Sequence, residues 1–295
     1  MCHAQSFRPA YGKGVVMDPQ RNAAMTAHRA ANSDWLENLA RVGFIALGVL
    51  HVLIGWLALQ LAWFGGGKSA DQSGAFSSVK ELPGGQVLLW ILGIGLFALA
   101  LWQAAEIFRW WRGLSAGGDA RKKAISHIVK SVVKVIIYIS LGLLAIRTAS
   151  GTAQSSSQQQ KQATQGIFGM TGGRFLVGLA GLIVIAVGLY HVYKGWTKKF
   201  LEGIDVSDAS PSQRTAITRL GQVGYPAKGV ALAILGGLLV WAAVTYDPDK
   251  ASGLDGALRT VLDVPFGQVL LTLVALGLIA FGVFCFFRAR YPERT

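Results

Sequence analysis

Seven ionisable side chains interrupt or border the long apolar runs of this sequence, and they are the residues that could do chemistry. They are His51, Glu106, Lys134, His191, Lys194, Lys228 and Arg288. His51 stands near the middle of its run, where it is either neutral and hydrogen-bonded to a neighbouring helix or a titrating relay or ligand. The others stand nearer the edges, where charges either anchor a helix at the membrane surface or line a polar path. Both interpretations stay open.

No known catalytic constellation accompanies these residues. The sequence has no Gly-rich phosphate loop, no His-Glu-x-x-His, no Cys-x-x-Cys and no Gly-x-Ser-x-Gly. Its two cysteines, Cys2 and Cys285, have no metal-like spacing. We therefore expect a protein that is not an enzyme and has no catalytic residue, metal or cofactor. A bis-histidine site formed by His51 and His191 between helices stays open beside this expectation.

The composition is that of a membrane protein. Hydrophobic residues make up 52% of the 295 residues and charged residues only 15%, whereas soluble domains carry about 25% charged residues. The net charge of +13 would suggest a nucleic-acid partner in a soluble protein. In a membrane protein, Lys and Arg accumulate instead in the loops on the cytoplasmic side. The distribution of the positive charges decides between the two.

The positive charges gather on alternate sides of the apolar runs. Residues 1–41, 106–134, 194–228 and 288–295 hold 21 of the 28 Lys and Arg residues. The positive-inside rule therefore places both termini in the cytoplasm. We expect anionic headgroups at that face and no nucleic-acid partner.

Six apolar runs approach the roughly 20 residues needed to cross a bilayer. They are at about 40–63, 86–109, 127–149, 173–196, 222–245 and 266–288. The third is the weakest, because Lys130, Lys134 and Arg147 flank its charge-free centre. Lys134 should face protein or water rather than lipid. The fold class is therefore all-α, a polytopic integral membrane protein with six transmembrane helices.

The spans form three copies of a two-helix unit. Gly43–Val49 recurs as Gly224–Val230, and Pro83–Gln86 recurs as Pro265–Gln268 and more loosely as Thr171–Arg174. An even number of spans per unit makes the repeats parallel, which predicts a pseudo-threefold arrangement. The register then aligns Lys134 with Lys228, and Glu106 with Lys194 and Arg288. We expect a ring of ionisable groups at the cytoplasmic end, with Glu106 able to pair with Lys134 or Lys228.

These repeats resemble a bacterial membrane family catalogued as domain of unknown function 1206. The resemblance rests on Gly43, Gly48 and Gly55 with their counterparts in the third unit, and on the starts of the even spans. It covers about residues 36–291. It implies six spans in a bacterial cytoplasmic membrane and no activity. The second unit departs from the pattern at Lys130 and Val135, where the other two have glycines.

The expected organisation is a leader and three membrane units. Residues 1–35 form a polar, disordered cytoplasmic leader, and the units cover 36–112, 123–200 and 215–291. Short capped helices are expected in the first and third outer loops, either lying at the interface or plugging a pore mouth. The Ser/Gln-rich tract 154–165 of the middle loop is expected to be flexible.

Two functions fit these observations. The first is a membrane scaffold or accessory subunit of undefined molecular activity, with the bilayer and a membrane-protein partner or a second copy as its partners. The second is a small channel or transporter whose polar path follows the repeat axis past His51. The direction in which the ionisable ring points would separate the two.

Overall fold

The structure, a computed structural model, describes residues 19–65, 67–111 and 118–291. Within these ranges every regular element is a helix. The six long ones are α1 (Pro19–Phe64), α3 (Gly85–Trp111), α4 (Gly118–Ser150), α6 (Gly173–Trp196), α7 (Pro211–Thr245) and α9 (Gly267–Arg290). The short ones are α2 (Gln72–Lys80), α5 (Ser156–Phe168), α8 (Gly253–Leu262), η2 (Lys199–Gly203) and η3 (Pro248–Lys250). The predicted all-α class is therefore confirmed. The six long helices are also long and apolar enough to cross a membrane, as the sequence predicts.

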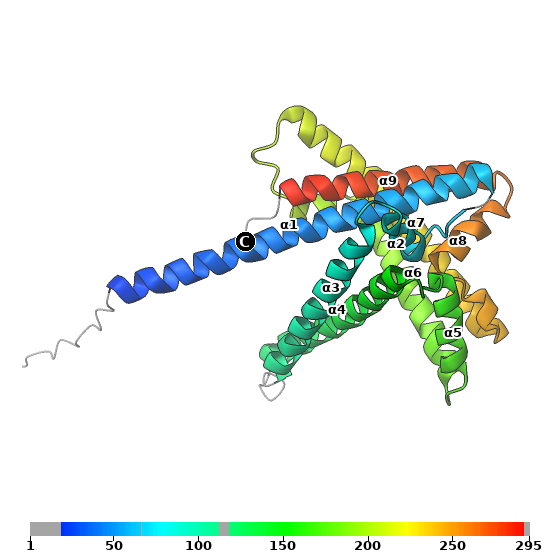
Figure 1. Cartoon of the computed structure of the whole chain (residues 1–295), viewed down its shortest axis with the longest axis horizontal. Helices are drawn as coiled ribbons and strands as arrows, with labels where there is room; N and C mark the ends of the chain where they lie inside the picture. The colour runs from blue at the N-terminus through cyan, green and yellow to red at the C-terminus, as the bar shows by residue number, and fades with distance from the viewer. Residues whose placement is uncertain (1–18, 66, 112–117, 292–295) are drawn as a thin grey trace, which may run out of the picture.

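The first helix begins earlier than the sequence suggested. Residues 19–35, assigned above to a polar leader, are helical and continue without a break into the span that starts near Arg41. Figure 1 shows this part of α1 projecting beyond the other helices. Residues 1–18 lie outside the described part of the chain.

The spans pair between repeats rather than within them. α1 packs along α9, α4 along α3, and α7 along α6. Each pair therefore joins the first helix of one repeat to the second helix of another. The same rule applied three times closes a cycle, which is the pseudo-threefold relation predicted from the parallel repeats.

Small residues let the paired helices approach closely at equivalent positions. Gly55, Gly142 and Gly236, the residues that define the repeat register, each face the partner helix. A Cβ built on Gly236 would come within 2.7 Å of the Gly181 carbonyl oxygen, and one on Gly55 within 2.7 Å of the Ala275 carbonyl oxygen. Such small-residue contacts favour helix association in membranes, where burial from water gives no driving force.

The turn before each even span repeats in all three copies. Gly84, Gly172 and Phe266 all have left-handed backbone, with φ of 75°, 77° and 60°. The residue that follows is always glycine, and a Cβ there would clash with a carbonyl oxygen of the preceding short helix, at 1.8 Å for Gly85 and 1.7 Å for Gly173. The Gly-rich motifs noted in the sequence are therefore the tight link between short helix and span.

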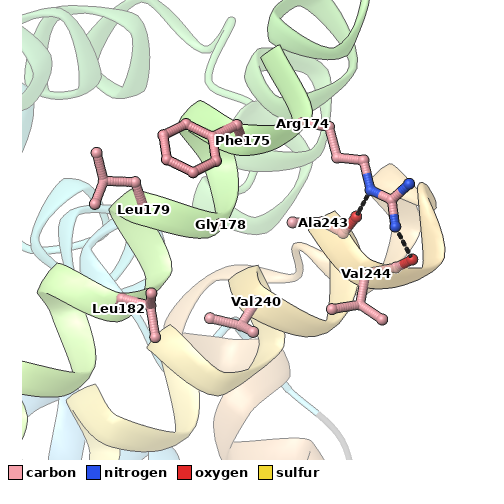
Figure 2. A pocket seen from close by; sticks show the side chains of 8 residues that line it. All are labelled: Arg174, Phe175, Gly178, Leu179, Leu182, Val240, Ala243 and Val244. Carbon is pink, nitrogen blue, oxygen red and sulfur yellow. Dashed lines mark hydrogen bonds between the residues drawn. The ribbon is translucent and has the colours of Figure 1, made fainter. Parts of the chain in front are cut away.

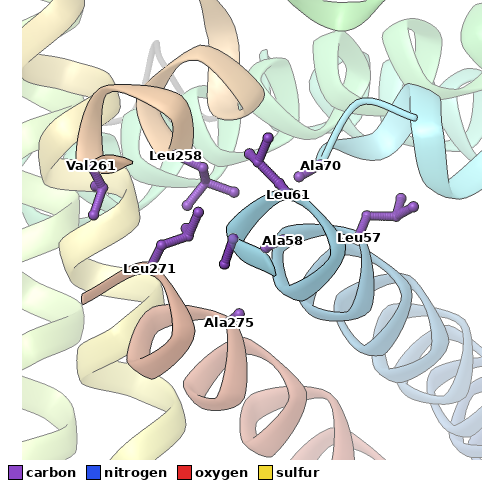
Figure 3. Packing of buried hydrophobic residues seen from close by; sticks show 9 residues of the cluster. Leu57, Ala58, Leu61, Ala70, Leu258, Val261, Leu271 and Ala275 are labelled. Carbon is purple, nitrogen blue, oxygen red and sulfur yellow. The ribbon is translucent and has the colours of Figure 1, made fainter. Parts of the chain in front are cut away.

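One buried apolar cluster lies where α8 meets the ends of α1 and α9 (Figure 3). Leu57 and Leu61 of α1 contact Leu258 of α8 and Leu271 of α9 in one cluster. α2 is also packed inward, because its Ala75 is fully buried beside Ile54 and Leu278. The predicted short helices exist in the first and third outer loops, and both pack on the span ends.

The middle outer loop is a helix rather than a flexible tract. Ser155 caps α5 by accepting a hydrogen bond from the Gln158 amide at 3.2 Å. The far end of α5 is held by Phe168, which stacks on Tyr246 with ring centroids 4.9 Å apart. The helix also packs on α6 and α8, so the Ser/Gln-rich segment is an ordered helix and the prediction of flexibility was wrong.

The three pairs converge at the end where α2, α5 and α8 lie and diverge toward the other end (Figure 1). The α1–α9 and α6–α7 pairs stay in contact through α7 and α9. The α3–α4 pair packs mainly on itself and on α2. This divergence decides which of the predicted polar residues can meet.

Candidate functional site

The polar residues that come together lie between α1, α6, α7 and α9. The Phe281 ring of α9 is their centre. The Lys228 ammonium of α7 lies 4.3 Å from its centroid, and the His51 ring of α1 lies 4.8 Å from it. Two of the predicted polar-path residues thus share one aromatic ring, which accepts a cation on its negative face.

Tyr225 extends this centre toward α6. Its ring packs edge to face against Phe281 at 5.1 Å and stacks on Phe200 of η2 at 5.3 Å. The Lys194 ammonium lies 5.3 Å from the centroid of the same ring. Phe200, Tyr225 and Phe281 are all buried, so the two lysines approach a packed aromatic wall.

Arg288 completes the group from the end of α9. Its guanidinium carbon lies 4.4 Å from the centroid of the Phe44 ring, and a Cβ on Gly203 would come within 2.9 Å of Nη2. The guanidinium also reaches the Tyr225 hydroxyl. Its Nε is buried and has no hydrogen-bond partner in the described part of the chain.

The remaining predicted residues are placed differently. The His191 ring stacks on Tyr225 at 5.9 Å and therefore borders the group. Lys134 is exposed on α4, outside it. Glu106 lies on α3, and its side chain is outside what the structure describes, so its pairing with Lys134 or Lys228 stays a prediction.

His51 and His191 both hydrogen-bond within their own helices. Nδ1 of His51 lies 2.9 Å from the Leu47 carbonyl oxygen, and Nδ1 of His191 lies 2.8 Å from that of Val187. A hydrogen bond to a carbonyl oxygen means that Nδ1 carries the proton. A hydrogen-bonded histidine was expected at position 51, but its acceptor is four residues back and not on a neighbouring helix.

A second polar group joins the short helices at the opposite end of the spans. Oδ1 of Asp255 accepts a hydrogen bond from the Ala70 amide at 2.8 Å, which links the third repeat to the first. The Ser156 amide donates to Ser73 Oγ at 3.2 Å, and Ser157 Oγ donates to the Ser252 carbonyl at 2.9 Å. Each repeat is therefore bonded to the other two at this end.

Asp71 lies inside that junction. Its Oδ1 caps α2 by accepting from the amides of Ser73 and Gly74, while its Oδ2 is buried without a partner among the described residues. Burial raises the pKa of the Asp71 carboxyl, and the nearby Asp255 charge acts in the same direction. The sequence predicts a capped helix in this loop, and Asp71 is its cap. Its burial against another repeat follows from tertiary packing, which the cap motif does not encode.

An apolar groove of about 360 Å³ lies between α6 and α7 near the same end (Figure 2). Arg174 is its one charged lining residue. Its Nε and Nη2 donate to the carbonyl oxygens of Ala243 and Val244 at 2.5 and 2.6 Å. The arginine therefore satisfies the open carbonyls at the C-terminal end of α7, which is a structural task.

The cation-aromatic cluster (His51, His191, Lys194, Tyr225, Lys228, Phe281 and Arg288) is the candidate site. In the described part of the chain, no carboxylate lies within 4.0 Å of its two lysines or its arginine. Its donors and positive charge suit the binding of an anion rather than of a cation or metal. The register in the sequence found the charges, but the aromatic partners were not predicted.

The sequence model of the family described as Domain of Unknown Function (DUF1206) matches the chain three times, at residues 42–108, 129–198 and 223–292. The chain is also similar to the uncharacterised protein YxxB of Bacillus subtilis (strain 168). The two are 27% identical over 271 residues, which cover 92% of this chain and 96% of the relative. No solved structure matches the chain.

Proposed function

The chain belongs to the DUF1206 family, and from that premise we propose that it is a non-enzymatic scaffold or accessory subunit that holds a partner's transmembrane helix. The occupant we propose lies against the α3–α4 pair. The observation that carries this proposal is the uncovered apolar face of α3. Support for each step comes from burial and from the distribution of small residues.

The α3–α4 pair is poorly covered by the rest of the chain. The buried share of the most apolar 18-residue window is 18% in α3 and 22% in α4, so neither helix of this pair reaches the 28% of α1 and α7 or the 50% of α9, although α6 alone has 17%. α3 is nevertheless strongly apolar, with Ile91, Ile94 and Leu101 all more than 60% exposed. A helix of a second protein would cover the apolar face of this pair in the way that α7 covers a face of α9.

The uncovered face of α3 has room for a close helix contact. Gly95 and Ala98 lie on it, at i+4 spacing from the exposed isoleucines, and a Cβ on Gly95 would meet nothing within 4 Å. Small residues on an apolar face permit the backbone approach that stabilises membrane helix pairs. Gly93, two residues earlier, already uses the opposite face against Ile146 of α4.

We also propose that the protein lies in the bacterial cytoplasmic membrane with both termini in the cytoplasm and anionic headgroups at that face. The support is the excess of Lys and Arg in alternate loops. Fusion of green fluorescent protein to the C-terminus should fluoresce, and fusion of a periplasmic phosphatase there should be inactive. The reverse result would overturn this orientation.

The scaffold proposal is tested by quantitative affinity purification in mild detergent. We expect a membrane protein to co-purify in a fixed ratio with the wild-type chain and to be lost with Gly95→Leu. The matched control is Gly237→Leu on α7, because a Cβ on Gly237 would also meet nothing within 4 Å, but on another pair. This control should leave the ratio unchanged. Recovery of the chain alone in all three cases would count against the scaffold.

Transport is the second candidate, supported by His51 and Lys228 sharing the Phe281 ring inside the spans. Its test is flux of protons and monovalent ions through the purified protein in liposomes, with His51→Ala in parallel. Protein-dependent flux that the substitution abolishes would favour a conduction path. Equal leakage from liposomes with and without the protein would exclude transport of these ions.

A further inference from the structure

We propose that Lys194, Lys228 and Arg288 bind a phosphate-type anion at the cation-aromatic cluster. The ligand is either the headgroup phosphate of an anionic phospholipid or a free phosphate, because both present the same oxygens. The proposal rests on three observations: positive charge, donors without acceptors, and the position of Lys194 and Arg288 near the ends of their spans.

The positive charges of the group are not neutralised within the described part of the chain. None of the three cations forms one of the ion pairs found there. The exposed Glu202 carboxylate acts on Lys194 from a greater distance than an ion pair. The positive charge of Arg288 acts on Lys194, and an anion between these two groups would remove the cost of that repulsion.

The group also has hydrogen-bond donors to spare. Nε of Arg288 is buried without an acceptor among the described residues. The ammonium groups of Lys194 and Lys228 lie over the rings of Tyr225 and Phe281, and no described acceptor bonds to them. A buried donor normally has a partner, so these groups point to an acceptor that the chain itself does not supply.

The location favours phosphate over other anions. Lys194 and Arg288 both lie in the last turn of their membrane-spanning helices. The phosphates of a bilayer lie at this depth, and basic pockets between transmembrane helices are known to bind phosphorylated headgroups. A guanidinium with flanking ammonium groups also matches the several oxygens of one phosphate.

The experiment measures thermal protection of the purified full-length protein in detergent. The probes are short-chain phosphatidylglycerol, short-chain phosphatidylcholine and inorganic phosphate. Lys228→Gln and Arg288→Gln are the test variants. Lys134→Gln is the matched control, because Lys134 occupies the register position of Lys228 in the second repeat but is exposed outside the cluster.

We expect phosphatidylglycerol to protect the wild type and the control at the same concentrations, and to need about tenfold more in each test variant, as loss of one charge-assisted bond predicts. Protection by inorganic phosphate with the same variant dependence would identify a soluble ligand. Phosphatidylglycerol acting alone would identify a lipid. Arg288→Lys, which keeps the charge, should retain part of the protection if the variants fold alike by circular dichroism.

Two results would overturn the site. The first is equal protection by phosphatidylglycerol and phosphatidylcholine with no effect of inorganic phosphate. The second is an equal loss of protection in Lys134→Gln, since that would place the effect on general surface charge.

Discussion

At the scale of single residues, Asp71 couples a helix cap to the junction of the three repeats. Burial raises the pKa of its carboxyl above the ordinary value of 3.8. The folded state therefore holds the proton more tightly than the unfolded state does. The contribution of Asp71 to stability is largest below pH 3.8 and is lost as the pH rises through the folded pKa.

Asp71→Asn should reverse that loss. The Asn carbonyl keeps the bonds from the Ser73 and Gly74 amides and brings no charge into the junction. We expect the variant to be as stable as the wild type or more stable at pH 7, with a flatter pH dependence. Thermal unfolding in detergent between pH 4 and 8 measures it. An Asn variant that is less stable at pH 7 and equally pH-dependent would contradict this account.

Phe266 is a residue whose backbone conformation matters more than its side chain. It has φ of 60° where Gly84 and Gly172 stand in the other repeats, and its side chain is 84% exposed. Left-handed backbone costs a residue with a side chain about 1–2 kcal/mol. Phe266→Gly should therefore raise the free energy of unfolding or leave it unchanged.

The same measurement on Gly172→Ala supplies the comparison. This substitution puts a side chain on left-handed backbone, so a loss of about 1 kcal/mol is expected. If Phe266→Gly destabilised the protein as much as Gly172→Ala does, the left-handed backbone at Phe266 would not be the cause of a stability cost.

At the scale of elements, the helix pairs depend on small residues, and two adjacent glycines of α7 behave differently. A Cβ on Gly236 would come within 2.7 Å of the Gly181 carbonyl, whereas one on Gly237 would meet nothing within 4 Å. Gly236→Val should destabilise the α6–α7 pair by about 1–3 kcal/mol, as overpacking does. Gly237→Val should cost much less, so the pair of variants isolates the contact. Unfolding in detergent measures the loss of stability in each variant. Similar losses in both variants would argue against this packing.

The sequence predicts the elements better than their partners. Hydropathy marks the six spans because each must satisfy its own backbone in lipid, and repeated motifs mark the turns at Gly84 and Gly172. The motifs do not state that α1 pairs with α9. Gly229 and Gly236 both pack on α6, but in the sequence a small residue on an apolar helix can equally face lipid.

The candidate site was predictable only in part, for the same reason. Register alignment grouped Lys194 with Arg288 because it compares equivalent positions in the repeats. It could not show that the α3–α4 pair diverges and leaves Lys134 exposed. Nor could it show that Tyr225 and Phe281 supply the surface on which the lysines lie. Such contacts arise from packing between repeats.

At the scale of the whole molecule, the unequal burial of the pairs is the feature that requires a function. The chain bonds its three repeats together at the end of α2, α5 and α8, yet it covers α3 far less than α9. An apolar face with a glycine can meet lipid or another helix, and the room left by Gly95 suits a second helix. The scaffold proposal supplies that helix.

The most direct test of this central claim is photocrosslinking in living cells with a photoreactive phenylalanine at Ala98. Leu189, on the exposed face of α6, serves as the reference position. The account predicts an adduct of one discrete protein mass at position 98, absent at position 189 and lost when Gly95→Leu is added. The same diffuse lipid labelling at both positions would contradict it.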